Sequence, residues 1–354
     1  MKTIIVDMMG GDRAPAETIR GVALAASELD ASYILVGDRE ILEEEAKNVG
    51  VSLDGFEIVH APTVITMEDE PACIMREKAD SSMSVGLKLL KEGRGDAFVS
   101  TGNTGALFTG ANLIVRRTPG LRRPAIAALL PMNPPLLLLD SGANVSVTPD
   151  YLEEFALMGA AYMKKLHGVE NPRVGLLNNG SESHKGTPLQ IEAYRLLSEN
   201  PAIHFVGNVE GNRVMADACD VLVTDGFTGN VLLKTAEGMG TMMLSTMKKL
   251  FLANLKTKIG ALCVKSQLSG VKKQFDTREF GGAPILGIAK PVIKAHGNSD
   301  AKAFKNAIRQ ALAAAESSLT EEIATSMEGL LEHRRQRAER EVREEKREEQ
   351  GSAE

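Results

Sequence analysis

The sequence predicts an α/β fold built on a mostly parallel β-sheet. Short apolar runs recur along the chain, each ends in a polar or glycine turn, and helix-like segments lie between them. Strands that alternate with helices imply right-handed crossovers and a parallel sheet covered on both faces. The runs expected to be strands are 4–7, 33–38, 56–60, 97–101, 136–141, 174–179, 204–208 and 221–225. The helix-like segments include 16–29, 104–116, 150–167 and 188–199.

Composition narrows the class of protein. The 354 residues are 43% hydrophobic and 25% charged, as in ordinary globular proteins, and allow one large or two medium domains. A formal net charge of −6 argues against a general nucleic-acid binder. The three cysteines have no metal-ligand spacing, so we expect reduced, buried thiols. Without a signal-peptide pattern or an apolar run of about 20 residues, a cytoplasmic protein is expected.

Five of the expected turns suit an anionic ligand. Glycine lets the backbone approach a ligand closely, and free N–H groups at a helix start bind anions. Since ligands of α/β sheets bind beyond the carboxyl ends of the strands, we expect these turns at one edge, around a phosphate-like ligand. The alternative is that Gly, Asn, Asp and Ser merely form turns. In chain order the turns are M-M-G-G-D (8–12), S-T-G-N-T-G (100–105), D-S-G-A-N (140–144), N-N-G-S-E-S-H-K-G (178–186) and T-D-G-F-T-G-N (224–230).

Nucleotide-binding fingerprints are absent from these turns. The chain contains neither G-x-x-x-x-G-K-[ST] nor G-x-G-x-x-G, which disfavours ATP and NAD. It also lacks G-x-S-x-G and H-E-x-x-H, so neither a serine nucleophile nor a zinc site is indicated. Chemistry without a covalent intermediate, metal or other cofactor is therefore favoured.

Three side chains are candidates for chemistry. Lys294 and His296 follow a strand-like apolar run and precede a capping sequence at 298–300, where they could bind an anion or transfer a proton. Lys185, in a glycine-flanked turn, could be a fixed cation. The alternatives are a structural, hydrogen-bonding histidine and a plainly exposed lysine. Together with the turns, these groups fit direct attack of bound phosphate on an activated carbonyl.

The segment 238–275 breaks the alternation of strands and helices. It has no acidic residue, and apolar residues recur three and four positions apart, which indicates a basic amphipathic helix. Such a segment suits an anionic membrane or an acidic partner; the alternative is packing within the protein or across a dimer. The charged tail at 332–349 is expected to be a solvated helix or disordered, with no chemistry. The lysines of the basic segment are Lys248, Lys249, Lys256, Lys258, Lys265, Lys272 and Lys273.

Seven ordered motifs, between about residue 3 and residue 315, together resemble one family. This family is the bacterial phosphate acyltransferases of phospholipid synthesis, known as PlsX. The motifs are D-M-M-G-G-D-R-A-P (7–15), S-T-G-N-T-G-A (100–106), L-L-D-S-G-A-N (138–144), G-L-L-N-N-G-S-E-S-H-K-G (175–186), V-T-D-G-F-T-G-N-V-L-L-K-T (223–235), F-G-G-A-P-I-L-G (280–287) and P-V-I-K-A-H-G-N-S-D (291–300).

The resemblance implies a fold and a reaction. The fold would be a three-layer α/β/α sandwich related to phosphotransacetylases and, more distantly, to isocitrate-dehydrogenase-like enzymes. It would form one catalytic domain over 1–330, with an excursion at 238–275 and a tail at 331–354. The reaction would transfer a fatty acyl group from acyl carrier protein to inorganic phosphate. The resemblance also implies a homodimer with peripheral contact to an anionic membrane and a downstream membrane glycerol-3-phosphate acyltransferase as partner.

The resemblance further implies roles for particular residues. Lys185, Asn230 and His296 would be catalytic. Substrate and phosphate would contact Gly10, Gly11, Asp12, Ser100, Thr101, Gly102, Asn103, Thr104, Asn144, Asp225, Gly226, Thr228, Gly229, Lys234 and Lys294. Membrane or dimer contacts would involve Leu252, Leu255, Lys256, Lys258, Ile259 and Leu262. The competing interpretations are a phosphotransacetylase acting on acyl-coenzyme A, a nucleotide-linked dehydrogenase and a non-enzymatic membrane scaffold.

Overall fold

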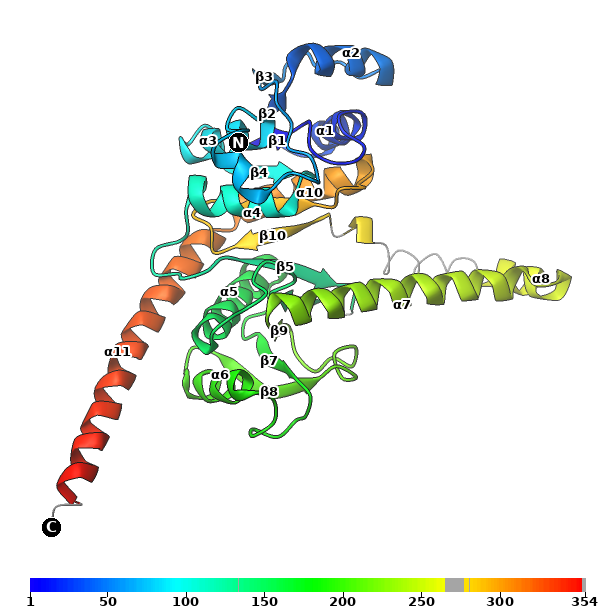
Figure 1. Cartoon of the computed structure of the whole chain (residues 1–354). Coiled ribbons are helices and arrows are strands. Elements are labelled where there is room, and N and C mark those ends of the chain that lie inside the picture. Colours follow the sequence, from blue (N-terminus) through cyan, green and yellow to red (C-terminus); the bar gives the residue numbers. More distant parts are fainter. Residues whose placement is uncertain (133, 265–276, 280, 352–354) are drawn as a thin grey trace.

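The computed structural model describes residues 1–354 except 133, 265–276, 280 and 352–354. For 262, 263, 277 and 344–351 it describes the backbone alone. The described strands form one sheet in the order β3-β2-β1-β4-β11-β10-β5-β6-β9-β7-β8 (Figure 1). They are β1 (Lys2–Asp7), β2 (Ala31–Gly37), β3 (Glu57–His60), β4 (Ala97–Ser100), β5 (Ala125–Leu130), β6 (Leu136–Leu139), β7 (Arg173–Asn178), β8 (His204–Glu210), β9 (Val221–Val223), β10 (Gly282–Leu286) and β11 (Val292–Ala295).

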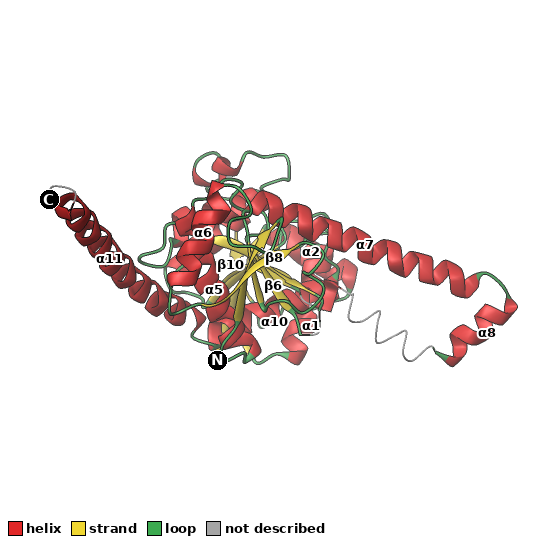
Figure 2. Ribbon diagram, turned by 90° about the horizontal axis from the view of Figure 1, so that it is seen from below, coloured by secondary structure: helices red, strands yellow, loops and turns green. Residues whose placement is uncertain are grey.

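Helices cover both faces of this sheet (Figure 2). The described α-helices are α1 (Ala16–Glu28), α2 (Arg39–Val49), α3 (Ser82–Lys91), α4 (Thr104–Gly110), α5 (Pro149–His167), α6 (Pro188–Glu199), α7 (Gly226–Leu252), α8 (Leu255–Cys263), α10 (Ala301–Glu316) and α11 (Leu319–Gly351). Shorter helical segments are η1 (Pro71–Met75), η2 (Ala111–Val115, a π-helix) and η3 (Thr277–Glu279). The α/β prediction is confirmed, as are the strand-like runs it was based on.

The alternating apolar residues of each strand build the two outer layers. In β1, Ile4 and Val6 pack against α1 and α10, whereas Ile5 joins the core under α3 and α4. In β6, Leu137 and Leu139 face α5, whereas Leu138 faces the first turns of α7. Successive side chains of one strand thus enter different cores. This alternation produces the expected three layers.

Three consecutive antiparallel pairings interrupt the parallel sheet. β10 pairs antiparallel with β11 and with β5, and β5 pairs antiparallel with β6. An odd number of reversals makes β1, β4 and β11 run opposite to β6, β9 and β7. The prediction that all five polar turns share one edge is therefore wrong. The turns after β1 and β4 lie at one edge, and those after β6, β7 and β9 lie at the other.

Helix α7 leaves the body of the molecule. Figures 1 and 2 show that it projects far beyond the sheet and that α8 continues from its tip. Among its described residues, Gly226 and Gly229 alone are buried. Apolar side chains along it are exposed, including Met242 at 56% and Leu250 at 63%. None of the helices in the described part of the chain combines the length and the apolar character needed to cross a bilayer.

The charged tail is the outer part of α11, which begins at Leu319. Its Arg334 donates to carboxylate oxygens of Glu153 (3.1 Å) and Glu154 (3.0 Å) on α5. Both glutamates are fully buried. A buried carboxylate without a cationic partner is very unfavourable, so the ion pairs of Arg334 hold α11 against α5. The proposed domain boundary at 330/331 falls inside this helix.

Replacing Arg334 by Ala is expected to cost about 3 kcal/mol of unfolding free energy, because it leaves two buried carboxylates with weaker partners. Urea unfolding followed by circular dichroism measures the loss. Arg335→Ala is the matched control, since the Arg335 side chain is 77% exposed and lies 3.9 Å from Glu332. The control should stay within about 0.5 kcal/mol of the parent. Equal stability of the two variants would contradict the proposed role of Arg334.

Candidate functional site

The first polar turn is organised by Asp7, the last residue of β1. Its side chain is fully buried. One carboxylate oxygen accepts the N–H groups of Met9 (3.2 Å) and Gly10 (3.3 Å) and the hydroxyl of Ser82 (2.6 Å). The other accepts the hydroxyl of Ser100 (2.6 Å). Burial raises the pKa of Asp7, and these hydrogen bonds oppose the rise. The sequence analysis did not identify Asp7.

Glycines let the turns after β1 and β4 press against each other. A methyl group added at Gly10 would lie 2.8 Å from the Cα of Gly102, closer than real Cβ contacts. Gly11 has φ of +99°, a backbone conformation that disfavours other residues. The hydroxyl of Thr101 donates to the carbonyl of Gly10 and ties the two turns together. The two turns therefore form one rigid unit.

Lys294, near the end of β11, lies beside these turns and is only 8% exposed. Its Nζ donates to the carbonyl oxygens of Thr101 (3.4 Å) and Ala295. Burial lowers the pKa of Lys294 to about 8, against the opposing charges of Asp12 and Asp7. The amine is therefore mostly protonated at pH 7 and becomes neutral a little above it. A buried ammonium of this kind can bind an anion.

His296 follows Lys294 in the next turn. Its Nδ1 accepts the N–H of Asn298 (3.2 Å), which leaves the proton of the neutral ring on Nε2. Burial, followed by the charges of Lys234 and Lys294, lowers the pKa of His296. The imidazole is therefore neutral at pH 7 and can donate one hydrogen bond from Nε2.

At the opposite edge, Asp140 organises the turn after β6. Its fully buried carboxylate accepts five hydrogen bonds. The side-chain amide of Asn144 is engaged by this carboxylate and by the carbonyl of Pro124 (2.9 Å). Asn144 is thus held inside its own turn. The donors to Asp140 are the backbone N–H groups of Ile126 (3.2 Å), Gly142 (3.1 Å), Ala143 (3.1 Å) and Asn144 (2.6 Å) and the Nδ2 of Asn144 (2.8 Å).

Helix α7 begins against this turn. A methyl group at Gly229 would lie 1.9 Å from the carbonyl oxygen of Asp140, so only glycine permits the contact. The N–H of Gly226 donates to the carbonyl of Asn144 (2.7 Å). Asp225 caps the helix by accepting the N–H (2.8 Å) and hydroxyl (2.7 Å) of Thr228. A carboxylate therefore already occupies the positive end of the helix.

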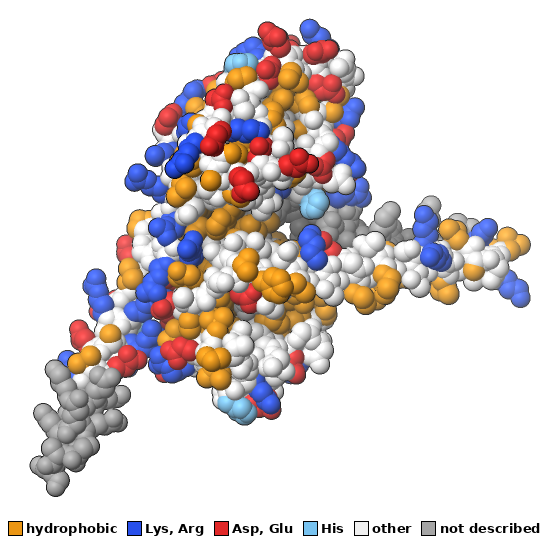
Figure 3. All heavy atoms as spheres, in the orientation of Figure 1, with side chains coloured by type: hydrophobic (Ala, Val, Ile, Leu, Met, Phe, Trp, Pro, Cys, Tyr) orange, Lys and Arg blue, Asp and Glu red, His pale blue; other side chains and the backbone are white. Residues whose placement is uncertain are grey.

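One face of α7 connects the two edges of the sheet. The side chain of Asn230 is exposed and lies beside Gly142, where an added methyl group would lie 3.7 Å from its Cβ. Lys234, four residues on, lies on the same face and pairs with Glu237 (2.7 Å). The charges of Lys234 and Glu237 act on His296. In Figure 3 a histidine lies near basic and acidic side chains where the upper half of the molecule meets α7.

The structure thus sorts the predicted site residues into two groups joined by α7. The amide of Asn103 donates to the carbonyls of Thr66, Met67 and Asp69, and its oxygen caps α4. The first group holds Gly10, Gly11, Asp12, Ser100, Thr101, Gly102, Asn103, Thr104, Lys294 and His296. The second holds Asn144, Lys185, Asp225, Gly226, Thr228, Gly229 and Asn230.

Lys185 is exposed in the turn after β7, beside the strand that leads into α7. The Nδ2 of Asn178 donates to its carbonyl (3.1 Å), and its N–H donates to the carbonyl of Glu182 (3.1 Å). These bonds fix the backbone and leave the ammonium without an ion pair among the described residues. Lys185 is therefore available to a ligand, although no described contact joins it to Asn230.

The residues predicted to contact a membrane or a second subunit lie at the tip of α7 and in α8. Leu252, Leu255 and Ile259 are 53%, 74% and 56% exposed. Lys256 and Lys258 are exposed beside them. Leu262 belongs to α8, but its side chain is outside the described part. Lys265, Lys272 and Lys273 fall wholly outside the described residues.

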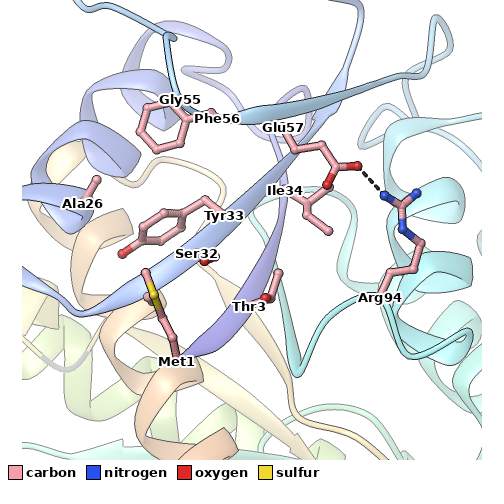
Figure 4. A pocket seen from close by; sticks show the side chains of 11 residues that line it. Met1, Thr3, Ala26, Ser32, Tyr33, Ile34, Gly55, Phe56, Glu57 and Arg94 are labelled. Carbon is pink, nitrogen blue, oxygen red and sulfur yellow. Dashed lines mark hydrogen bonds and ion pairs between the residues drawn. The ribbon is translucent and has the colours of Figure 1, made fainter.

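A hollow of about 390 Å³ lies away from both groups of turns (Figure 4). Tyr33 and Phe56 form part of its wall, and Arg94 pairs with Glu57 at its side. It lies near the amino ends of β1 and β2, opposite the turn that follows β1. Within the described residues, no group of His, Cys, Asp and Glu could hold a metal ion. Neither feature adds a residue to the candidate site.

Comparison with known proteins identifies relatives along nearly the whole chain. The family described as "Fatty acid synthesis protein" matches residues 2–322. A phosphate acyltransferase of Acetivibrio thermocellus is 47% identical over 322 residues, which cover 90% of this chain and 95% of that protein. A phosphate acyltransferase of Alkaliphilus oremlandii is 43% identical over 328 residues, which cover 92% and 98%.

Solved structures share the fold at low identity. A phosphotransacetylase from Streptococcus pyogenes has a TM-score of 0.61 and 18% identity, covering 92% of this chain and 94% of that one. A 4-hydroxythreonine-4-phosphate dehydrogenase from Klebsiella pneumoniae has a TM-score of 0.56 and 12% identity, covering 89% and 100%. These similarities confirm the predicted relation to the phosphotransacetylase fold.

Gly229→Ala is expected to destabilise the protein by at least about 2 kcal/mol, because the new methyl group collides with the backbone of Asp140. Gly238→Ala, in the same helix, has no atom within 4 Å of the added methyl group. This control should gain about 0.5–1 kcal/mol from the lower flexibility of the unfolded chain. Thermal unfolding of both variants tests the difference. If Gly229→Ala were as stable as Gly238→Ala, the close contact between α7 and Asp140 would be wrong.

Proposed function

The chain belongs to the fatty acid synthesis protein family, and from this membership we propose the donor and product of its reaction. It is an acyltransferase whose curated relatives are phosphate acyltransferases. In our proposal the donor is a fatty acyl thioester of acyl carrier protein, the acceptor is inorganic phosphate, and the product is an acyl phosphate for phospholipid synthesis. The observation that carries the proposal is the face of α7 that joins Gly142 to His296.

Phosphate binding is assigned to the side of the crevice that carries the positive charges. Lys294 is a buried ammonium, and Lys234 reaches the same region from α7. The neutral His296 can donate from Nε2 to a phosphate oxygen. The start of α7 is less suitable for phosphate, because the carboxylate of Asp225 already caps it and would repel a second anion. This refines the sequence analysis, which placed phosphate at that turn.

The thioester carbonyl is assigned to the other side, beside Asn230. Positions four apart on a helix lie about 5–6 Å from each other, so a phosphate held by Lys234 would be close to a carbonyl held by Asn230. Such placement can supply up to about 7–11 kcal/mol relative to free reactants. The amide of Asn230 would donate to the developing oxyanion, a contribution of about 3–4 kcal/mol. Lys185 would stabilise negative charge from the neighbouring turn.

The chemistry then needs no covalent intermediate on the protein. An oxygen of hydrogen phosphate forms a bond to the carbonyl carbon, and the carbon–sulfur bond breaks. The thiolate of the carrier leaves and takes the proton that hydrogen phosphate brought. Residues of the chain hold the reactants and stabilise charge, and His296 acts as a neutral donor at pH 7.

The reaction is tested by acyl phosphate formation from palmitoyl carrier protein and inorganic phosphate. Asn230→Ala is expected to lower kcat at least ~100-fold, roughly the loss of one oxyanion donor, and Lys185→Ala should give a comparable loss. Ser245→Ala on α7 and Lys47→Ala on α2 are exposed controls and should keep parental rates. Palmitoyl-coenzyme A is assayed in parallel. Turnover of the coenzyme A thioester alone would reject the carrier-protein donor and favour a phosphotransacetylase-type reaction.

The tip formed by α7 and α8 is proposed to mediate association with a second copy and with an anionic membrane. Leu255 and Ile259 are exposed beside Lys256 and Lys258, so apolar insertion and electrostatic attraction act together. Peripheral contact would let acyl phosphate pass to a membrane glycerol-3-phosphate acyltransferase. The proposed setting is the cytoplasmic surface of the membrane.

The double variant Leu255→Glu with Ile259→Glu separates these roles. We expect it to lose at least ~10-fold in binding to anionic phospholipid vesicles while it still turns over soluble acyl carrier protein. The control, Ser245→Glu with Thr246→Glu, adds the same charge at polar positions of α7. It should bind vesicles more tightly than Leu255→Glu with Ile259→Glu. Light scattering after size exclusion reports the oligomeric state. Loss of the dimer with retained vesicle binding would place these residues in a subunit interface instead.

A further inference from the structure

We infer that Asp7 is a positioning residue of the phosphate site, which fixes the turns after β1 and β4 and supplies the buried negative charge that faces Lys294. This inference rests on the proposed function, because it assigns a role within the site that binds phosphate there. Asp7 itself would contact no reacting atom. A methyl group at Gly10 would lie 2.7 Å from Oδ2 of Asp7, so the glycine turn covers the carboxylate and separates it from the crevice.

The hydrogen bonds of Asp7 join three elements of the structure. Met9 and Gly10 belong to the turn after β1, Ser82 begins α3, and Ser100 ends β4. The hydroxyl of Ser100 in turn accepts the N–H of Gly102 (3.0 Å). The N–H groups of Met9 and Gly10 can only donate, and the hydroxyls of Ser82 and Ser100 donate as well, so these hydrogen bonds favour the ionised carboxylate against the effect of burial on its pKa. Its removal would loosen both glycine turns at once.

The charge of Asp7 also acts on Lys294. Lys294 pairs with Ser100 in the sheet, and the hydroxyl of Ser100 donates to Asp7. The charges of Asp12 and Asp7 act on Lys294, and those of Lys234, Lys294, Glu237 and Asp12 act on the neighbouring His296. Asp12 is exposed to solvent, whereas Asp7 is fully buried. Asp12 acts on Lys294 more strongly than Asp7, but the charge of Asp7 lies in the interior and is screened less, so its loss should also lower the pKa of Lys294.

The sign of the effect on pH dependence follows from the ammonium of Lys294. Protonated Lys294 binds phosphate, and it loses its proton as the pH rises through about 8. Removing the negative charge of Asp7 destabilises the protonated form of Lys294 and lowers its pKa further. The loss of phosphate affinity should therefore begin at a lower pH. A purely structural role would reduce affinity equally at every pH.

The test is calorimetric titration of the full-length protein with inorganic phosphate alone, between pH 6 and pH 9. Asp7→Asn keeps the shape of the side chain and removes its charge. We expect the alkaline decline in phosphate affinity to move down by roughly one pH unit, a change in the Lys294 proton affinity of about tenfold. Asp96→Asn, which removes an acid paired with Lys2 at the far end of β4, should leave the decline in place. An unmoved decline in Asp7→Asn would overturn the inference.

Two further variants keep the inference falsifiable. Lys294→Arg stays charged at all these pH values, so its alkaline decline should disappear; persistence would assign the decline to another group and reject the inference. Ser100→Ala keeps the charge of Asp7 and removes one hydrogen bond, so phosphate affinity should fall at least ~3-fold without a shift in pH. If Asp7→Asn does not fold, an unchanged affinity in Ser100→Ala would reject the positioning role.

Phosphate binding without an acyl donor separates this inference from the proposed function. Phosphate binding with the expected shift, but without turnover of acyl carrier protein, would reject the donor and retain Asp7. Turnover by a protein whose phosphate affinity does not depend on Asp7 would retain the function and reject the inference. Absence of phosphate binding in the parent protein would reject both.

Discussion

The reversal of strand direction in the middle of the sheet constrains everything around the candidate site. Because β10 and β5 pair antiparallel with their neighbours, the two parallel groups of strands on either side of them run in opposite directions. In a simple doubly wound sheet, the carboxyl ends of neighbouring strands build a crevice at one edge. Here the two sets of polar turns are at opposite edges, and an additional element must connect them. Helix α7 does so, because it starts against Asp140 and passes His296.

Two buried aspartates perform equivalent tasks in the two halves. Asp7 gathers the turns after β1 and β4, and Asp140 gathers the turn after β6. Each carboxylate is placed at the end of a strand and is satisfied by backbone N–H groups and side-chain donors. A buried charge is tolerated only with such complete hydrogen bonding, which in turn makes the turns rigid. The exposed groups at each edge, among them Asn230 and His296, are thereby carried on fixed backbones.

Much of the fold was predictable from the sequence, because its parallel strands are continuous apolar runs. β5 and β10 were not predicted for physical reasons. The first is rich in alanine, which is uncommon in strands, and lies between Pro124 and Pro131, and the second contains Pro284, which is typical of a break in a strand. Without these two strands the reversal of direction was not predicted, and the turns after β6, β7 and β9 were expected at the same edge as those after β1 and β4. Pairing between distant strands has no signature in local periodicity.

The sequence identified candidate residues of the site better than it predicted the hydrogen bonds that these residues make. Lys294 and His296 were identified by their position after a strand, and the structure places them beside the turns after β1 and β4. The sequence could not show that the amides of Asn103 and Asn144 donate to protein groups, since their acceptors include carbonyl groups distant in the chain. Asp7 was missed although it stands in the first motif. An Asp at a strand end signals a turn or a ligand equally well, and burial alone distinguishes them.

The length of α7 gives the site a mechanical property. The helix is fixed where Gly229 meets Asp140, and its end at Leu252 lies about 35 Å further on at 1.5 Å per residue. Lys234 is only about 7 Å from that fixed point. If the helix pivots as a rigid lever, a displacement at the tip reaches Lys234 reduced about fivefold and hardly moves Asn230. Lys234 and Asn230 are thus displaced far less than the tip.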